Sequence, residues 1–87
     1  MRVIITKRFE KEEDRLNNRQ TSHQIADTII QIRNTESTTQ ILSLKRLKGA
    51  KAYRIRIGDY RIGVLIDDDT VEFISVGHRK EFYKSFP

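Results

Sequence analysis

The strongest structural signal in the chain is the stretch Tyr53-Arg54-Ile55-Arg56-Ile57-Gly58-Asp59-Tyr60-Arg61-Ile62-Gly63. Its residues alternate between two faces on either side of Gly58-Asp59, which is typical of two strands joined by a two-residue turn. Such a turn pairs Ile57 with Tyr60 and therefore sets Arg56 directly opposite Arg61. The stretch predicts a tight β-hairpin.

The predicted hairpin has a cationic face and an apolar face. Arg54 lies opposite Gly63, on the same face as Arg56 and Arg61. The other face is apolar and carries Tyr53, Ile55, Ile57, Tyr60, Ile62 and Val64. Arginines that face each other destabilise a sheet slightly, so a polyanion bound to this face would offset their repulsion. The alternative is that the arginines only form the solvated face of an amphipathic hairpin.

The composition describes one small globular domain. The chain has 87 residues, 33% charged and 37% hydrophobic, which supports a single core with a helical layer on a small sheet. An active site on such a domain is a shallow groove open to a large substrate. The absence of cysteine excludes disulfides, thiolate metal sites and cysteine nucleophiles. No apolar run is long enough to span a bilayer, so we expect a cytoplasmic protein with no membrane partner.

The net charge of +5 is concentrated in the middle of the chain. Between residues 45 and 61 the acid is Asp59, and the basic residues are Lys45, Arg46, Lys48, Lys51, Arg54, Arg56 and Arg61. A local excess of this kind favours a face that binds a polyanion over charge that only maintains solubility.

The first half of the chain predicts a strand followed by two helices. Residues 2–6 are a strand candidate, and residues 7–17 form a charged helix. Thr21 and Gln24 have capping-box spacing, so a second, amphipathic helix begins at Thr21 and ends near Asn34. We expect the two helices to form a hairpin laid across the sheet.

The second half predicts an antiparallel sheet. Residues 34–40 are a loop, and residues 41–47 are ambiguous, one possibility being an extended lead-in that docks its leucines on the core. Asp67-Asp68-Asp69 is read as a turn, because consecutive carboxylates diverge and no histidine is near enough in sequence to suggest a metal. Residues 71–77 form a covered strand, and residues 78–86 a short helical turn. The predicted fold of residues 1–87 is α+β: a strand, a two-helix hairpin, three further strands and a C-terminal helical turn.

His78, Arg79 and Tyr83 follow the last predicted strand. If this strand pairs antiparallel with residues 60–66, His78 and Arg79 lie near the turn of the arginine hairpin. Each could be structural by itself, but together they bring a proton carrier, a cation and a stacking surface beside the arginines. The chain has no glycine-rich phosphate loop and no Ser, His and carboxylate set, so no metal or nucleotide cofactor is expected.

Three motifs resemble the RelE/ParE superfamily of bacterial toxins, closest to its RelE branch. They are Leu44-x-x-Leu47-x-Gly49, the hairpin from Tyr53 to Ile62, and Ile74-Ser75-Val76-Gly77-His78-Arg79-x-x-x-Tyr83. The resemblance covers the C-terminal half in motif and the whole chain in length and element order. It implies a strand, a helical hairpin and a twisted antiparallel sheet.

The resemblance also implies an mRNA endoribonuclease that cuts translated message in the ribosomal A site without a metal. By position, Arg61 would bind the scissile phosphate, Arg79 would neutralise or protonate the leaving oxygen, and Tyr83 would stack on the attacked nucleotide. His78 would be an accessory group, and Arg54 and Arg56 take the two basic places on the first hairpin strand. The flanking RNA-binding residues would be Lys45, Arg46, Lys48 and Lys51.

One departure concerns the general base, since the RelE type member has lysines where this chain has Arg54 and Arg56. Arginine stays protonated in proteins, so Arg56 is expected to stabilise the phosphorane, leaving proton abstraction to Tyr83, His78, water or a ribosomal group. The implied partners are a cognate antitoxin, the 30S subunit and, through the antitoxin, operator DNA. The competing functions are a ParE-like gyrase inhibitor and a non-catalytic RNA-binding module.

Overall fold

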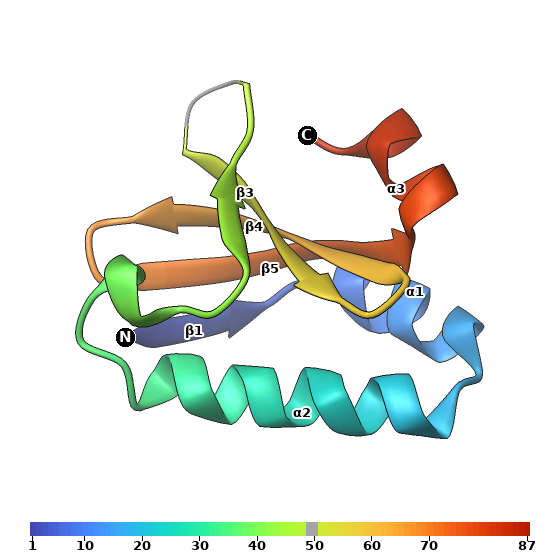
Figure 1. Ribbon diagram of the computed structural model, residues 1–87, viewed down its shortest axis with the longest axis horizontal. Helices are drawn as coiled ribbons and strands as arrows, with labels where there is room; N and C mark the ends of the chain where they lie inside the picture. The colour runs from blue at the N-terminus through green and yellow to red at the C-terminus, as the bar shows by residue number, and fades with distance from the viewer. Residues whose placement is uncertain (49–50) are drawn as a thin grey trace.

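The computed structural model describes residues 1–48 and 51–87 (Figure 1). Gly49, the last residue of the first motif, lies outside the described residues. The elements in chain order are β1 Arg2–Ile5, α1 Lys7–Leu16, α2 Arg19–Arg33, the 3₁₀ turn η1 Thr38–Gln40, β2 Leu44–Arg46, β3 Ala52–Ile57, β4 Tyr60–Asp67, β5 Thr70–His78 and α3 Arg79–Ser85. This order confirms the predicted α+β architecture.

The strands form one sheet in the order β1-β5-β4-β3-β2. β1 runs parallel to β5, and every other neighbouring pair is antiparallel. The predicted hairpin is confirmed residue by residue, because Ile57 pairs with Tyr60 and Arg56 with Arg61. The sheet has one more strand than expected, since the ambiguous residues 41–47 contain β2. Short segments such as β2 give too little alternation to be recognised by pattern alone.

The two faces of the sheet are covered by different helices. In Figure 1, α1 and α2 lie below the sheet and α3 lies above it, on the opposite face. The larger core lies between the sheet and the two helices α1 and α2. There Phe9 of α1 meets Phe73 of β5 edge to face, with ring centroids 5.4 Å apart. A second, smaller core of Ala52, Phe82 and Phe86 lies between α3 and the sheet.

The start of α2 differs from the capping box predicted at Thr21. The helix begins at Arg19, and the N-cap is Asn18, whose side-chain oxygen accepts a hydrogen bond from the Thr21 N–H at 3.0 Å. Thr21 is buried inside the first turn and therefore cannot cap the helix. The prediction was wrong because Asn18, three residues before Thr21, is also a residue type favoured at N-caps, and packing decides which of the two is used.

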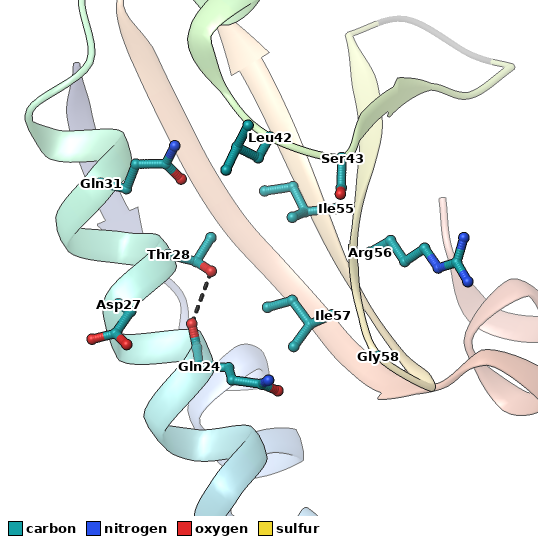
Figure 2. Close-up of a pocket in the computed structure, with 10 residues that line it drawn as sticks. All are labelled: Gln24, Asp27, Thr28, Gln31, Leu42, Ser43, Ile55, Arg56, Ile57 and Gly58. Atoms are coloured by element: carbon teal, nitrogen blue, oxygen red, sulfur yellow. Dashed lines mark hydrogen bonds between the residues drawn. The ribbon is translucent and has the colours of Figure 1, made fainter.

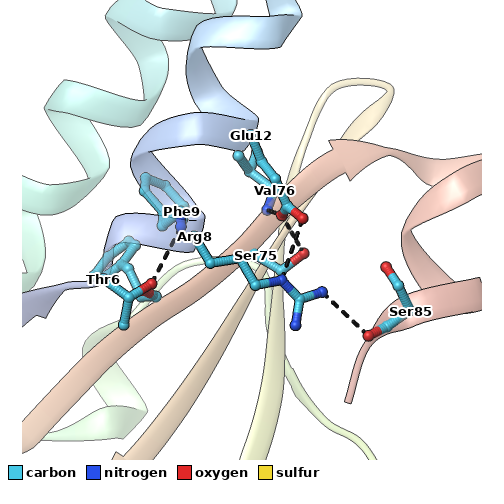
Figure 3. Close-up of polar contacts among 8 residues, drawn as sticks. Thr6, Arg8, Phe9, Glu12, Ser75, Val76 and Ser85 are labelled. Atoms are coloured by element: carbon cyan, nitrogen blue, oxygen red, sulfur yellow. Dashed lines mark hydrogen bonds and ion pairs between the residues drawn. The ribbon is translucent and has the colours of Figure 1, made fainter.

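A carboxylate on α1 covers the part of β5 that β1 does not reach. The pairing of β1 with β5 ends at Phe73, and beyond it Glu12 accepts hydrogen bonds from the Ser75 hydroxyl at 2.7 Å and the Val76 N–H at 3.0 Å (Figure 3). Arg8 donates to Glu12 at 3.2 Å and to the Ser85 carbonyl at 3.2 Å. This network ties α1, the end of β5 and α3 together.

The same contacts set the ionisation of Glu12. Burial raises the pKa of this carboxyl, but hydrogen bonds from Ser75, Val76 and Arg8 outweigh burial and hold the pKa below its ordinary value of 4.5. The neighbouring carboxyl behaves in the opposite way: burial, followed by the charges of Asp14 and Glu10, raises the pKa of Glu13. The fold thus favours the ionised form of Glu12 and disfavours that of Glu13.

Candidate functional site

Basic side chains occupy two rows of the sheet on the face that carries α3. In one row Arg56 of β3 faces Arg61 of β4, as the sequence predicts. In the other row Lys45 of β2 faces Arg54 of β3. The second pair of facing cations was not predicted, because it depends on the register of β2. The face therefore concentrates positive charge across three strands.

The two facing arginines have different environments. Arg56 is exposed, and its side chain points away from α2 (Figure 2). Arg61 is only 9% exposed, and its Nη1 donates hydrogen bonds to the Gly58 and Tyr60 carbonyl oxygens, both at 2.9 Å. The buried Nε of Arg61 has no hydrogen-bond partner among the described residues. The guanidinium of Arg61 is therefore held by the turn, whereas Arg56 is exposed.

Arg54 is also held by a backbone oxygen. Its Nη1 donates to the Ser43 carbonyl at 3.0 Å, and the same oxygen accepts the Arg56 N–H at 3.3 Å. Ser43 has a φ of 60°, so the chain bends sharply there before β2 begins. The side chain of Arg54 and the backbone of Arg56 thus hold the residue that leads into β2. The sheet face that carries Arg54, Arg56 and Arg61, here called the arginine face, therefore has a structural role as well as a charge.

The last residue of β5 and the first residue of α3 reach the turn of the arginine hairpin, as predicted. His78 pairs with Tyr60 in the sheet, and their rings meet edge to face with centroids 5.7 Å apart. The Arg79 N–H donates to the Asp59 carbonyl at 2.8 Å. His78 is also the N-cap of α3, because its Nδ1 accepts the Lys80 N–H at 3.3 Å.

Aromatic side chains of α3 and of Phe86, the residue after it, hold the helix on the sheet face that carries Arg54 and Arg56. The Phe86 ring lies against Gly63, which faces Arg54 across β3 and β4. Phe82 is buried, and Tyr83 meets it edge to face with centroids 5.0 Å apart while staying 50% exposed. Arg79 and Tyr83 are one helical turn apart, so both lie on the same side of α3. α3 therefore forms a wall beside the cationic strands.

The four basic residues predicted to bind RNA beside the arginines lie in different environments. Lys45 shares the arginine face, and Lys48 is exposed. Arg46 lies on the other face, where its guanidinium is 5.9 Å from the centre of the Tyr53 ring across β2 and β3. Lys51 makes an exposed ion pair with Asp67 at 3.0 Å. Among these four, Lys45 has the clearest position next to the predicted site.

A groove that was not predicted from the sequence lies on the face of the sheet that α1 and α2 cover. A cavity of about 490 Å³ lies between α2 and β3 (Figure 2). Gln24, Asp27, Thr28 and Gln31 of α2 line it on one side, and Leu42 and the isoleucines of β3 line it on the other. Leu42 is 72% exposed. In the sequence, the sign of this groove was Leu42, an apolar residue in the segment 41–47, which has no clear periodicity.

Within residues 1–48 and 51–87, no three His, Asp or Glu side chains are grouped closely enough to hold a metal ion. No helix in the same ranges is long and apolar enough to cross a membrane.

Comparison with known proteins agrees with the fold and with the family resemblance. Residues 3–83 match the family profile described as ParE toxin of the type II toxin–antitoxin system parDE. The chain is 43% identical over 61 residues to Toxin RelE3 of Methanocaldococcus jannaschii, covering 68% of this chain and 69% of that protein.

Solved structures of toxin–antitoxin complexes also match. The RelB-RelE antitoxin-toxin complex from Methanococcus jannaschii contains a chain that superposes with a TM-score of 0.82 at 34% identity, covering 97% of this chain and 99% of that one. The complex RelBE2 from Mycobacterium tuberculosis matches with a TM-score of 0.60 at 24% identity, covering 90% and 96%, and this likeness concerns the fold alone.

The chain therefore belongs to the RelE/ParE superfamily of toxins from type II toxin–antitoxin systems. Its similarity to the archaeal RelE proteins puts it on the RelE branch of that superfamily.

Proposed function

We propose that this toxin is a ribosome-dependent endoribonuclease that cuts mRNA in the ribosomal A site. The observation that carries the proposal is the packing of Phe86 on Gly63, which holds α3 on the sheet face of Arg54 and Arg56. Cations on the strands and an exposed tyrosine on the helix then border one open surface. Such a surface suits a phosphodiester chain whose bases can stack on an aromatic ring.

The proposed reaction is an internal phosphoryl transfer. The ribose 2′-oxygen attacks the adjacent phosphorus, the bond from phosphorus to the 5′-oxygen breaks, and a 2′,3′-cyclic phosphate and a 5′-hydroxyl result. The 2′-hydroxyl proton leaves to a base, and the 5′-oxygen gains a proton. The phosphorane between these states carries extra negative charge, which prearranged cations stabilise.

Within this proposal Arg54 and Arg56 stabilise the phosphorane and do not transfer protons, because guanidinium groups stay protonated. Arg79 neutralises the leaving oxygen, and Tyr83 stacks on the attacked nucleotide. Arg61 would have to release the Gly58 and Tyr60 carbonyls to bind the scissile phosphate through Nη1.

The hydrogen bond at His78 narrows the choice of base. Its Nδ1 accepts the Lys80 N–H, so a neutral His78 carries its proton on Nε2. In that tautomer Nε2–H can donate a hydrogen bond but cannot accept a proton. His78 is therefore proposed as a donor near the leaving oxygen, and Tyr83, water or a ribosomal group remains for the attacking hydroxyl.

The proposed partners are a cognate antitoxin, the 30S subunit and, through the antitoxin, operator DNA. The antitoxin is supported by the similarity to a chain of the RelB-RelE antitoxin-toxin complex from Methanococcus jannaschii. An antitoxin with an acidic segment would compete with RNA for the arginine face.

Cleavage of mRNA on programmed ribosomes tests the proposal, with cut ends mapped by primer extension. Arg56→Ala and Arg79→Ala should each lower the cleavage rate by about one hundredfold or more, as expected when a preorganised charge is removed. Lys11→Ala changes an exposed cation on α1, on the other face of the sheet, and should leave the rate unchanged. Full activity of both arginine variants would overturn the proposal.

The second candidate is inhibition of DNA gyrase, favoured by the match of residues 3–83 to a profile described as ParE toxin. Its discriminating readout is DNA supercoiling by purified gyrase, with and without the toxin. Inhibition of supercoiling without any cut on programmed ribosomes would favour this function.

A further inference from the structure

We propose that Arg61 is a positioning residue that locks the Gly58–Tyr60 turn and, through this turn, fixes Arg79 at the start of α3. The contacts that make this lock lie within the free toxin. Where cleavage is used as a readout below, the inference rests on the proposed nuclease activity.

The guanidinium of Arg61 is committed to its own hairpin. Arg61 is buried, with 9% of its surface exposed, and one nitrogen, Nη1, bridges the Gly58 and Tyr60 carbonyl oxygens. These are charge-assisted hydrogen bonds in a buried setting, where losing a partner is costly. To contact a phosphate through Nη1, Arg61 would have to release both carbonyls.

The turn that Arg61 closes needs such a cross-link. Gly58 has a φ of 55°, a left-handed conformation, and glycine has more freedom than any other residue to leave it. The turn is exposed at Gly58 and Asp59, so packing does not hold it. Hydrogen bonds to the carbonyls on either side of Asp59 restrict the turn from within.

The same turn is the attachment point for the other wall of the site. Between the two carbonyls bound by Arg61 lies the Asp59 carbonyl, which accepts the Arg79 N–H at 2.8 Å. Tyr60 next to it meets the His78 ring. Three consecutive residues of one turn thus link Arg61 to His78 and Arg79, whose proposed roles are at the leaving oxygen.

Arg56 provides a matched comparison inside the protein. It carries the same charge directly across the ladder from Arg61, but its side chain is exposed and points away from α2. A variant at Arg56 therefore removes the same charge from the same face without opening the turn.

Amide hydrogen exchange in the free toxin, measured by NMR, tests the lock without RNA. Arg61→Met keeps a long apolar stem and should accelerate exchange of the Arg79 amide by about tenfold or more, because local opening no longer breaks two charged hydrogen bonds. Arg56→Met should leave the Arg79 amide unchanged. Arg61→Lys restores a cationic donor and should recover most of the protection.

Two outcomes of the exchange experiment would overturn the inference. One is an Arg79 amide that exchanges in Arg61→Met as it does in the parent. The other is an equal acceleration at the core amides of Val64 and Phe73, which would mean that Arg61 supports the whole fold and not this junction.

A double-mutant cycle tests the consequence for cleavage. If Arg61 acts through Arg79, the loss of kcat in Arg61→Met should shrink several-fold in an Arg79→Ala background, with KM little affected. Losses that multiply would instead indicate independent contacts with RNA and overturn the inference. A parent protein that cuts no mRNA would contradict the proposed function, and the exchange experiment would still decide the role of Arg61.

Discussion

Phe86 lies so close to Gly63 that a Cβ on the glycine would be 2.8 Å from three atoms of the ring. Phe86, the residue after α3, is buried, and its ring packs directly on the backbone of β4 at Gly63. Because Gly63 faces Arg54, this contact joins α3 to the cationic face. The absence of a side chain at one position of β4 thus decides where an entire helix lies.

Gly63→Ala should therefore destabilise the protein and loosen α3. A methyl group would displace the Phe86 ring from its seat, at a cost of about 1–3 kcal/mol in the free energy of unfolding. The measurement is urea denaturation followed by circular dichroism.

Gly77→Ala is the matched control for this substitution. Gly77 lies in β5, and a Cβ there would meet nothing within 4 Å, so its unfolding midpoint should hardly change. In a Phe86→Ala background, Gly63→Ala should cost far less than in the parent, because the clash has gone. Equal costs in the two backgrounds would show that Phe86 is not the cause.

The N-cap of α2 gives a second prediction. Asn18→Ala should lower the free energy of unfolding by about 1 kcal/mol, because the Thr21 N–H loses its acceptor. Gln24→Ala should be nearly neutral, since Gln24 is exposed and the helix does not begin at Thr21. The reverse order of effects in thermal unfolding would restore the capping box at Thr21 and Gln24.

Glu12 gives a prediction about pH. Its folded pKa is lower than 4.5, so its carboxylate stabilises the fold above that pH, and the stabilisation is lost as the pH falls through the folded pKa. Glu12→Gln should reduce the free energy of unfolding at pH 7 by about 1–3 kcal/mol, the range for hydrogen bonds to a charged group. The difference from the parent should diminish below pH 4.5.

Glu13→Gln is the control of opposite sign. The raised pKa of Glu13 means that its ionised form is disfavoured in the fold, so removing the charge should not destabilise the protein at pH 7. Denaturant unfolding from pH 3 to pH 8 compares the two variants. A pH-independent loss in Glu12→Gln would argue that the glutamine disturbs packing and not charge.

Arg56→Lys tests the proposed division of labour in catalysis. The parent should show no ionisation from position 56 in its pH–rate profile, because a guanidinium does not titrate in the working range. A lysine there would titrate below its usual value of about 10.4, since neighbouring cations disfavour its charged form. The variant should therefore gain an alkaline inflection.

Single-turnover cleavage on programmed ribosomes between pH 6 and pH 10 measures the two profiles. Superimposable profiles would mean that position 56 contributes neither charge nor proton transfer to the rate-determining step.

Local sequence was sufficient to predict the structure where two neighbouring segments pair with each other across a short turn. The alternation around Gly58-Asp59 determined the register of β3 and β4, because a two-residue turn leaves one way to pair the strands. The facing of Arg56 and Arg61 follows from that register. The family resemblance rests on the same residues, and the comparisons confirm it.

Contacts between distant segments were decided only by the tertiary structure. Facing of Lys45 and Arg54 depends on where β2 begins, which the bend at Ser43 sets. Likewise Glu12 reaches Ser75 across a sequence separation of 63 residues, and no local period reports such a pair.

For the three arginines of the hairpin, the sequence decided the face on which they lie, and the tertiary structure decided what each guanidinium contacts. The sequence determined that three of them share one face, because side chains alternate along a strand. Whether each guanidinium meets solvent, a carbonyl or a neighbouring charge depends on burial and on backbone groups brought in from elsewhere. Arg61 turns back to the Gly58 and Tyr60 carbonyls because its position in the sheet is buried, whereas Arg56, with the same side chain, remains in solvent.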